Sequence, residues 1–495
     1  MTFQQWPESA SSVELERDVE GFSNQFGAIL REIQAILQHI ASLESDYTAI
    51  QEEATNVNAY MQQQSAPNSV LQPNGINISS RYAEQMNALH SSINDMRKIC
   101  FEKLSEGQRI AWNMETALVS GILLKWKIEQ KIAQIGGQTN QLYNKLNQME
   151  DLFDNLLIQL VGLKSNAEGF MRHLERMTTS TEEYQSICDM VHALRSQINN
   201  FMFQSTVVAI QPPEILMLTR TPATDTTNKR GGRRPCQPTL RLLAGKQLGI
   251  WSQQINLTAH LISEQEAREL NDGKKQLADI LAARNSDKDT TAKGHPILRS
   301  NQATLQNIEN KFVGNFTRMY VTRRAKQHQA AGETGERVPK KKYYILFVYT
   351  LCAPGLDTLT IWRLSLPIGV FSHPKQVKEQ GGDASLFWNL GFSSGDGVLT
   401  EPPKNGIPAD DFFEKLSLHF QHYTGATRGL CTEARKYLAN KLVNRQGLVT
   451  WHKFEQQKIS SDDDGQFTFR QWWYYILETL SERGKKGFLE QWNAG

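Results

Sequence analysis

The chain has 495 residues, of which 39% are hydrophobic and 21% charged, and its formal net charge is +2. This composition supports a buried core and excludes both a disordered chain and a nucleic-acid binder that is basic throughout, although not a locally basic one. No stretch approaches the run of about 18 apolar residues that a membrane span requires. The first twenty residues do not combine a basic start with an apolar run. We therefore expect neither a membrane span nor a secretory signal, and the length predicts roughly three domains.

The first 205 residues carry the pattern of long helices. From Val19 to Met61 the apolar residues recur at alternating steps of three and four, which is a heptad repeat sustained over about six heptads. Three similar stripes follow within 81–135, 142–177 and 184–201, separated first by the breaker-rich segment 64–80. We expect an antiparallel four-helix coiled-coil bundle over 1–205. Such a bundle is either a structural spacer or, through its polar faces, a docking surface for protein partners.

From Thr206 the heptads give way to short runs rich in β-branched and aromatic residues. The runs expected to form strands are 206–210, 215–220, 239–243, 254–262, 316–322, 343–351 and 359–371. Their number and spacing predict an immunoglobulin-like β-sandwich over 206–380, interrupted by a partly helical polar insert at 263–294.

From about residue 381 to the end the pattern is again helical and contains many aromatic residues. We expect helices at 412–423, 432–442 and 469–481, and we expect the aromatic residues at 472–475 to pack in the core and at interfaces. The segment 381–495 is thus predicted to be a small helical domain.

The sequence does not contain the residue patterns of common enzyme sites. A nucleophile elbow, a phosphate-binding P-loop, a zinc-binding HExxH and a dinucleotide-binding glycine motif are all missing. His419 and His422 stand three residues apart, a spacing found more often on helix surfaces than at metals, and the acidic segment 462–465 matches only part of a calcium-binding loop. The five cysteines are widely scattered, which predicts free thiols in a reducing compartment. We expect no enzyme, no metal site and no cofactor.

Positive charge is concentrated in the predicted β domain. Residues 206–345 hold 23 Lys and Arg against 12 Asp and Glu, whereas the whole chain is nearly neutral. Clustered basic side chains in the loops of a β-sandwich suit contact with DNA phosphates, and glycines between them permit a close approach. A solvated charge run or a nuclear-import signal would produce the same pattern. The basic residues in these predicted loops form three clusters, which are Lys229, Arg230, Arg233 and Arg234, then Arg318, Arg323, Arg324 and Lys326, and finally Lys340, Lys341 and Lys342.

The order of the three parts and several local motifs resemble the STAT family, the signal transducers and activators of transcription. The motif FMFQSTVVAIQPP at 201–213 is similar to the family's passage from coiled coil to DNA-binding domain. SLPIGVFS at 365–372 with ASLFWN at 384–389 resembles a second family segment. WKIEQKIAQIGG at 126–137, VTWHKF at 449–454 and WNAG at 492–495 are further matches.

The resemblance implies further DNA contacts. The family's base-reading positions, just after the match SLPIGVFS at 365–372, are here His373 and Gln376, and Lys293 falls near a family phosphate contact. The basic loops match the family's loops in place but not in exact residues. Two family parts have no counterpart in this chain, a separate N-terminal helical domain and an SH2 domain after WNAG, so we expect a truncated fragment or a naturally short product.

The resemblance implies a sequence-specific DNA-binding transcription regulator of a STAT-like signalling pathway, located in cytoplasm and nucleus. Its partners would be double-stranded DNA and, through the coiled coil, other proteins. We expect this chain to be a monomer or weak dimer, with a phosphotyrosine-linked dimer if an SH2 domain follows in the full gene product. The alternative is a coiled-coil adaptor or dominant-negative product that binds partners without regulating DNA directly.

Overall fold

The computed structural model describes residues 12–64, 74–136, 142–176, 181–219, 236–285, 296–323, 341–353, 357–373, 376–377, 381–458 and 467–484. The chain divides into two compact units. The first comprises residues 1–121, 151–202 and 354–357, and the second comprises 122–150, 203–353 and 358–495.

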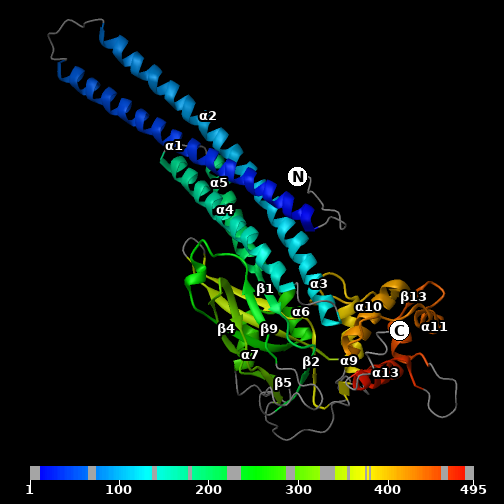
Figure 1. Cartoon of the computed structure of the whole chain (residues 1–495). Coiled ribbons are helices and arrows are strands. Elements are labelled where there is room, and N and C mark those ends of the chain that lie inside the picture. The colour runs from blue at the N-terminus through cyan, green and yellow to red at the C-terminus, as the bar shows by residue number, and fades with distance from the viewer. Residues whose placement is uncertain are drawn as a thin grey trace. The chain divides into compact units, whose positions relative to one another are not determined.

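The long helices predicted from the heptads are present (Figure 1). They are α1 (Ser12–Gln64), α2 (Asn74–Thr116), α4 (Leu142–Arg176) and α5 (Thr181–Gln204). After α2 the chain continues as a π-helical segment (Ala117–Leu123) and then α3 (Leu124–Gln134). The start of α2 corrects the expectation of a break through residue 80: Asn74 is a residue type that favours helix starts, and Gly75 costs only about 1 kcal/mol inside a helix. The π-helical segment has no counterpart in the heptad analysis.

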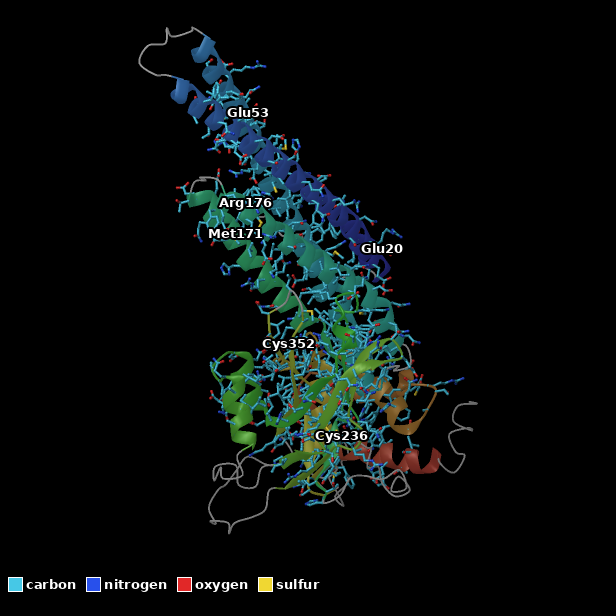
Figure 2. The ribbon with its side chains drawn as sticks, turned by 90° about the vertical axis from the view of Figure 1, so that its left-hand side faces the viewer. Glu20, Glu53, Met171, Arg176, Cys236 and Cys352 are labelled. Atoms are coloured by element: carbon cyan, nitrogen blue, oxygen red, sulfur yellow. The ribbon has the colours of Figure 1, made fainter. Side chains whose placement is uncertain are left out.

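The first unit is held together by the apolar stripes of its helices. Phe26, Ile33, Leu160 and Leu194 are completely buried, and Phe153 stacks on Phe201 with ring centroids 5.4 Å apart. Figure 2 shows α1 with Glu20 and Glu53 on it, and α4 with Met171 and Arg176.

One polar layer interrupts this apolar core. The Nη2 of Arg97 donates to the carbonyl oxygen of His173 at 3.1 Å, and Glu44 lies 3.5 Å from Arg97 and 2.8 Å from the Nδ1 of His173. Because a buried polar group is costly without its partners, this layer favours one register of α1, α2 and α4.

The β domain contains one continuous path of paired strands. Its order is β1–β3–β7–β6–β4–β9–β11–β2, with β10 added on β9. The strands are β1 (Thr206–Ile210), β2 (Ile215–Met217), β3 (Thr239–Leu242), β4 (Ile255–Ser263), β6 (Gln302–Ile308), β7 (Lys311–Asn315), β9 (Lys342–Leu351), β10 (Leu359–Leu364) and β11 (Ile368–Phe371). A separate pair is formed by β5 (Pro296–Arg299) and β8 (Tyr320–Arg323). The predicted helical insert is α6 (Glu264–Asn271) and α7 (Leu277–Asn285).

Two strand predictions need correction. The run at 316–322 forms a strand only from Tyr320, and the strands β5, β6 and β7 before it were not predicted. The run at 359–371 is two strands, because Pro367 has no backbone N–H and the Oγ of Ser365 instead accepts a hydrogen bond from the N–H of Ile345 at 2.9 Å.

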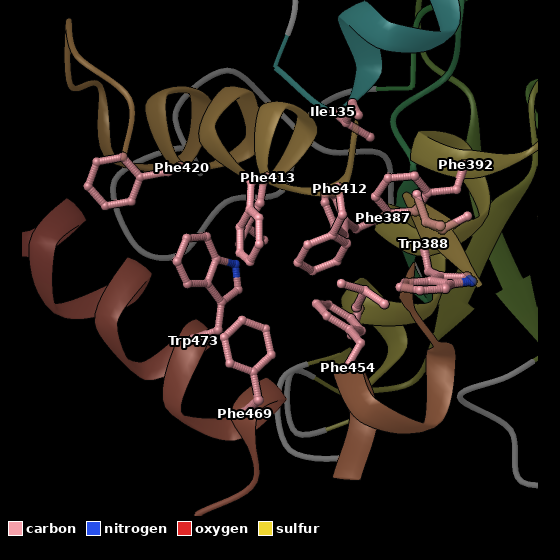
Figure 3. Packing of buried hydrophobic residues seen from close by; sticks show 14 of the residues in the cluster. Ile135, Phe387, Trp388, Phe392, Phe412, Phe413, Phe420, Phe454, Phe469 and Trp473 are labelled. Atoms are coloured by element: carbon pink, nitrogen blue, oxygen red, sulfur yellow. The ribbon is translucent and has the colours of Figure 1, made fainter. Parts of the chain in front are cut away.

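The C-terminal part of the second unit is a helical domain built around aromatic residues (Figure 3). Its helices are α9 (Gly382–Phe392), α10 (Ala409–Thr424), α11 (Thr432–Leu442), α12 (Trp451–Gln456) and α13 (Phe469–Gly484), with a short pair of strands, β12 (Ile407–Pro408) and β13 (Leu448–Val449). Of the consecutive aromatic residues, Trp473 and Tyr474 are buried whereas Tyr475 is 67% exposed. The predicted helices are confirmed, and α9 and α12 are additional.

His419 contradicts its predicted surface position. It is buried, its ring lies 4.5 Å from that of Phe387, and burial, with a smaller contribution from His422, lowers the pKa of His419 to about 3. The helix α10 therefore uses this histidine as a neutral core residue.

The predicted fold class, a helical coiled-coil region followed by a β-sheet domain and a helical domain, is confirmed. The domain boundaries near residues 205 and 380 stay predictions. All five cysteines are free thiols, and burial raises the pKa of Cys100 and of Cys236 to about 12.

Candidate nucleic-acid interface

Three strands of the β domain end side by side. β11 runs parallel to β2, and the next residue, Leu218, donates its N–H to the carbonyl oxygen of Phe371 at 2.8 Å. Thr219 then donates to the carbonyl oxygen of Val321 in β8, also at 2.8 Å, and the bridge between Leu218 and Val321 is parallel. Since parallel strands end at the same side, the carboxyl ends of β2, β8 and β11 form one edge. We call residues 218–219, 321–323 and 371–372 the strand-end edge.

The segments that contain most of the candidate DNA contacts begin or end at this edge. Residue 219 leads into the segment with the first basic cluster, and that segment ends at Cys236, which is bridged to Met319 at the opposite end of β8. Arg323 leads into the segment with the second cluster. Pro296 pairs with Arg323, so the segment that precedes β5 and contains Lys293 also ends there. Lys229, Arg230, Arg233, Arg234, Lys293, Arg324 and Lys326 themselves lie outside the described residues.

The two arginines of the second cluster that the structure describes, Arg318 and Arg323, lie at opposite ends of β8. Arg323 is the last residue of β8 and therefore belongs to the strand-end edge. Arg318 is exposed and precedes the other end of the same strand. The structure therefore separates two residues that the sequence places in one basic run.

His373 and Gln376 follow β11 directly at the strand-end edge. His373 is exposed, and its carbonyl oxygen accepts a hydrogen bond from the N–H of Gln376 at 3.1 Å. The Oε1 of Gln376 accepts two hydrogen bonds from Ser372, from its N–H at 2.7 Å and its Oγ at 2.9 Å. These bonds occupy both lone pairs of the amide oxygen, so in this conformation a bidentate contact with adenine through Oε1 and Nε2 is not available.

Some of the positive charge counted in the sequence is used inside the protein. Arg241 is completely buried and pairs with Glu150 at 2.6 Å, and the Nζ of Lys342 lies 3.2 Å from Glu264. These residues hold the fold together and add little to the surface charge. Lys341, in contrast, is exposed immediately before β9 and is a basic residue near the edge that the predicted contact set omitted. The run of three lysines at 340–342 is the sequence signal that marks it.

Two other kinds of site are missing from the described ranges. Among the residues whose placement the structure gives, no group of three or more His, Cys, Asp and Glu could hold a metal ion. Within the same ranges no helix has the length and apolar character of a membrane span.

Comparison with known protein families matches three consecutive parts of the chain. Residues 16–202 match "STAT transcription factor, coiled-coil domain", residues 236–371 match "STAT protein, DNA binding domain", and residues 400–473 match "Signal transducer and activator of transcription, linker domain". A coiled coil, a DNA-binding β domain and a helical linker thus follow one another in the order that the sequence motifs suggested. The chain belongs to the STAT family of transcription factors.

Individual relatives are distant but cover much of the chain. It is 25% identical over 506 residues to "Signal transducer and activator of transcription 1" of Caenorhabditis elegans, covering 97% of this chain and 64% of that protein. It is 25% identical over 427 residues to the protein of the same name from Caenorhabditis briggsae, covering 81% and 56%. The "Signal transducer and transcription activator" of Anopheles gambiae is 23% identical over 371 residues, covering 73% and 45%. The chain therefore spans about half to two thirds of the length of these relatives.

Proposed function

We propose that this chain is a sequence-specific DNA-binding regulator of transcription in a STAT-like signalling pathway, and that DNA lies against the strand-end edge. The observation that carries this proposal is the convergence of β2, β8 and β11, which brings one end of each basic segment to the same edge of the β domain. Positive side chains gathered on one side of a domain attract a phosphate backbone, whereas the same residues scattered over the surface would not.

In this proposal the basic residues and the pair after β11 have different tasks. Arg233 and Arg234, in a segment with two glycines, contact phosphates and contribute affinity for any sequence. His373 and the Nε2 of Gln376 donate to acceptors on base edges in the major groove. The hydrogen bonds from Ser372 hold the Gln376 amide in one orientation, and a fixed donor distinguishes bases better than a mobile one.

The partners and location follow from the same family membership. We infer that the coiled coil binds other proteins and that the regulator moves between cytoplasm and nucleus. Where the full gene product contains an SH2 domain, we infer that two chains dimerise because the SH2 domain of each binds the phosphotyrosine of the other. The chain itself acts by binding rather than by catalysis.

Fluorescence anisotropy tests the proposal. A preferred sequence is first selected from a random pool of duplexes, and affinities for that duplex and for random DNA are then measured at several salt concentrations. We expect a log–log salt slope of about −4 to −5, because four to six phosphate contacts suit a single module of this size.

Paired variants locate the interface. Arg233→Ala with Arg234→Ala should weaken binding to all sequences alike and reduce the salt slope by about one for each lost contact. The matched control is Arg81→Ala with Lys98→Ala, two exposed basic residues of α2 in the first unit. If the control weakens DNA binding as much as the loop variant, or if no sequence is selected from the pool, the strand-end edge is not the DNA surface.

A further inference from the structure

A cavity of about 400 Å³ opens within the second unit, apart from the strand-end edge. It is lined by α3, by β1 and β10, and by the turn at 396–400 that precedes α10. None of its lining residues belongs to the strand-end edge or to the proposed DNA contacts. Its volume falls in the range of about 300–1,000 Å³ that small-molecule sites occupy.

Positive charge dominates the polar part of this cavity. Lys127 of α3 and Arg363 of β10 line it, and the only carboxylate in the lining is that of Asp396, 3.8 Å from the Nζ of Lys127. The guanidinium of Arg363 donates to the carbonyl oxygens of Thr206, at 2.7 Å, and Phe203. These carbonyl oxygens hold the guanidinium in place, but they carry no full negative charge to neutralise it.

A third cation shares the same carboxylate. Lys131, one turn after Lys127, is buried, and its Nζ donates to the carbonyl oxygens of Ser393 at 2.6 Å and Gly395 at 2.9 Å. Burial lowers the pKa of Lys127, lowers that of Lys131 to about 8 and lowers that of Arg363 to about 10, while the charge of Asp396 opposes each shift. Asp396 is therefore shared by three partly desolvated cations, of which Lys131 is also influenced by Asp411, and an additional anion in the cavity would stabilise Lys127 and Arg363.

The remaining walls are apolar and aromatic. Trp362 meets Phe203 edge to face with ring centroids 5.2 Å apart, and the guanidinium of Arg363 lies 3.8 Å from the centre of the Phe203 ring. Aliphatic side chains of β1 and β10 complete this side, including Val208 and Leu364. A ligand that fits both walls has an apolar body and one anionic end.

Backbone strain marks the turn that closes the cavity. Leu399 has a φ of +56°, which is unfavourable by about 1–2 kcal/mol for a residue with a side chain. Its carbonyl oxygen accepts a hydrogen bond from Arg268 at 3.2 Å, which helps to hold this conformation. Strained residues of this kind cluster at ligand-binding segments.

We propose that this cavity binds a small organic anion, whose acidic group pairs with Lys127 and Arg363 and whose flat apolar body lies among the aromatic and aliphatic side chains. Because its walls come from α3, the β domain and the turn before α10, the bound anion ties these three elements together and stabilises the second unit.

Isothermal titration calorimetry on the whole chain tests this with two probes of the same shape, the anion 2-naphthoate and the neutral 2-naphthamide. We expect naphthoate to bind at least tenfold more tightly. Equal affinities, or no binding of naphthoate at millimolar concentration, would overturn the proposal.

Three substitutions assign the binding to the cavity. Lys127→Gln should weaken naphthoate at least tenfold and leave naphthamide unchanged, while Lys125→Gln on the same helix, outside the cavity lining, should change neither. Asp396→Asn should tighten naphthoate severalfold, because Asn can still accept the hydrogen bond from the N–H of Val398 but has no charge. If Lys127→Gln lowers the thermal unfolding midpoint, its weaker naphthoate binding could come from a damaged fold. The tighter naphthoate binding expected of Asp396→Asn is then the deciding test. An unchanged or weaker affinity in Asp396→Asn contradicts an anion site.

Discussion

The buried charge pair between α4 and β3 provides a sharp test of how the second unit is held together. Arg241 of β3 is completely buried, and its side chain contacts the first turns of α4. It donates to Glu150 at 2.7 Å through Nε and to Asn147 at 2.7 Å through Nη2, and its guanidinium lies 5.1 Å from the ring centre of Tyr143. We predict that Arg241→Met, which keeps the length of the side chain, strongly destabilises this unit.

The magnitude follows from what the substitution leaves behind. Removing one partner of a buried ion pair costs about 3–5 kcal/mol, because the other charge stays in a desolvated site. Glu150 is partly desolvated even with its partner present: burial raises the pKa of its carboxyl group, and the charge of Arg241 only partly offsets the shift. Without Arg241 the folded-state pKa of Glu150 rises further, so the carboxylate is penalised above pH 4.5 and the penalty decreases as falling pH protonates it.

Urea unfolding followed by tryptophan fluorescence measures this effect, since eight of the ten tryptophans belong to the second unit. The free-energy cost of Arg241→Met, relative to the unsubstituted chain at the same pH, should be smaller at pH 5 than at pH 7. The double variant Arg241→Met with Glu150→Met should cost less than the sum of the single variants, by about 1–3 kcal/mol. Additive costs and a pH-independent effect would refute the reasoning and reduce Arg241 to a packing residue.

Three further outcomes are expected. Gly136→Ala should destabilise the second unit by about 3–5 kcal/mol, because φ is +135° and an added Cβ would lie 2.2 Å from the carbonyl oxygen of Leu418, whereas Gly249→Ala, at φ +73° with open space, should cost only about 1 kcal/mol in the same urea assay. Between pH 6.5 and about 3, His419 is protonated in the unfolded chain but neutral in the folded one. Lowering the pH through this window should therefore reduce stability by about 1.4 kcal/mol per pH unit, and His419→Leu should flatten this part of the pH profile. Gln376→Ala should reduce the preference for selected over random DNA by about 0.5–1.5 kcal/mol in the anisotropy assay, because only the Nε2 of Gln376 is available as a donor, and equal losses on both duplexes would make Gln376 a positioning residue only.

The sequence predicts the helices well because their signal is local. A heptad repeat over dozens of residues specifies both the helix and the face that it buries, and the stripes that contain Phe26 and Leu160 are buried as expected. The strands β5 to β7 were missed because a proline in β5, several amide side chains in β6 and a glycine in β7 interrupt the alternating apolar pattern that marks a strand. They are stabilised by pairing with other strands rather than by their own composition.

The candidate interface could be predicted only in part. Local composition identifies the basic clusters, but the strand-end edge depends on the parallel pairing of β11 with β2, about 150 residues apart, which no local pattern indicates. Composition also cannot distinguish a buried arginine from an exposed one. Arg241 lies in a short strand that is buried at every position, so the usual alternation of sides does not place it.

Salt should separate these two uses of positive charge. Ions screen exposed charges and compete for DNA phosphates, but they penetrate little into a buried pair such as that of Arg241 and Glu150. Raising salt from 50 to 200 mM should therefore weaken DNA binding by about two to three orders of magnitude, given four to six phosphate contacts. Over the same range the unfolding free energy of the second unit should change by less than about 1 kcal/mol. If the unit loses stability in step with DNA affinity, the internal and external charges are not independent, and the weakened binding reflects a loosened β domain rather than lost phosphate contacts.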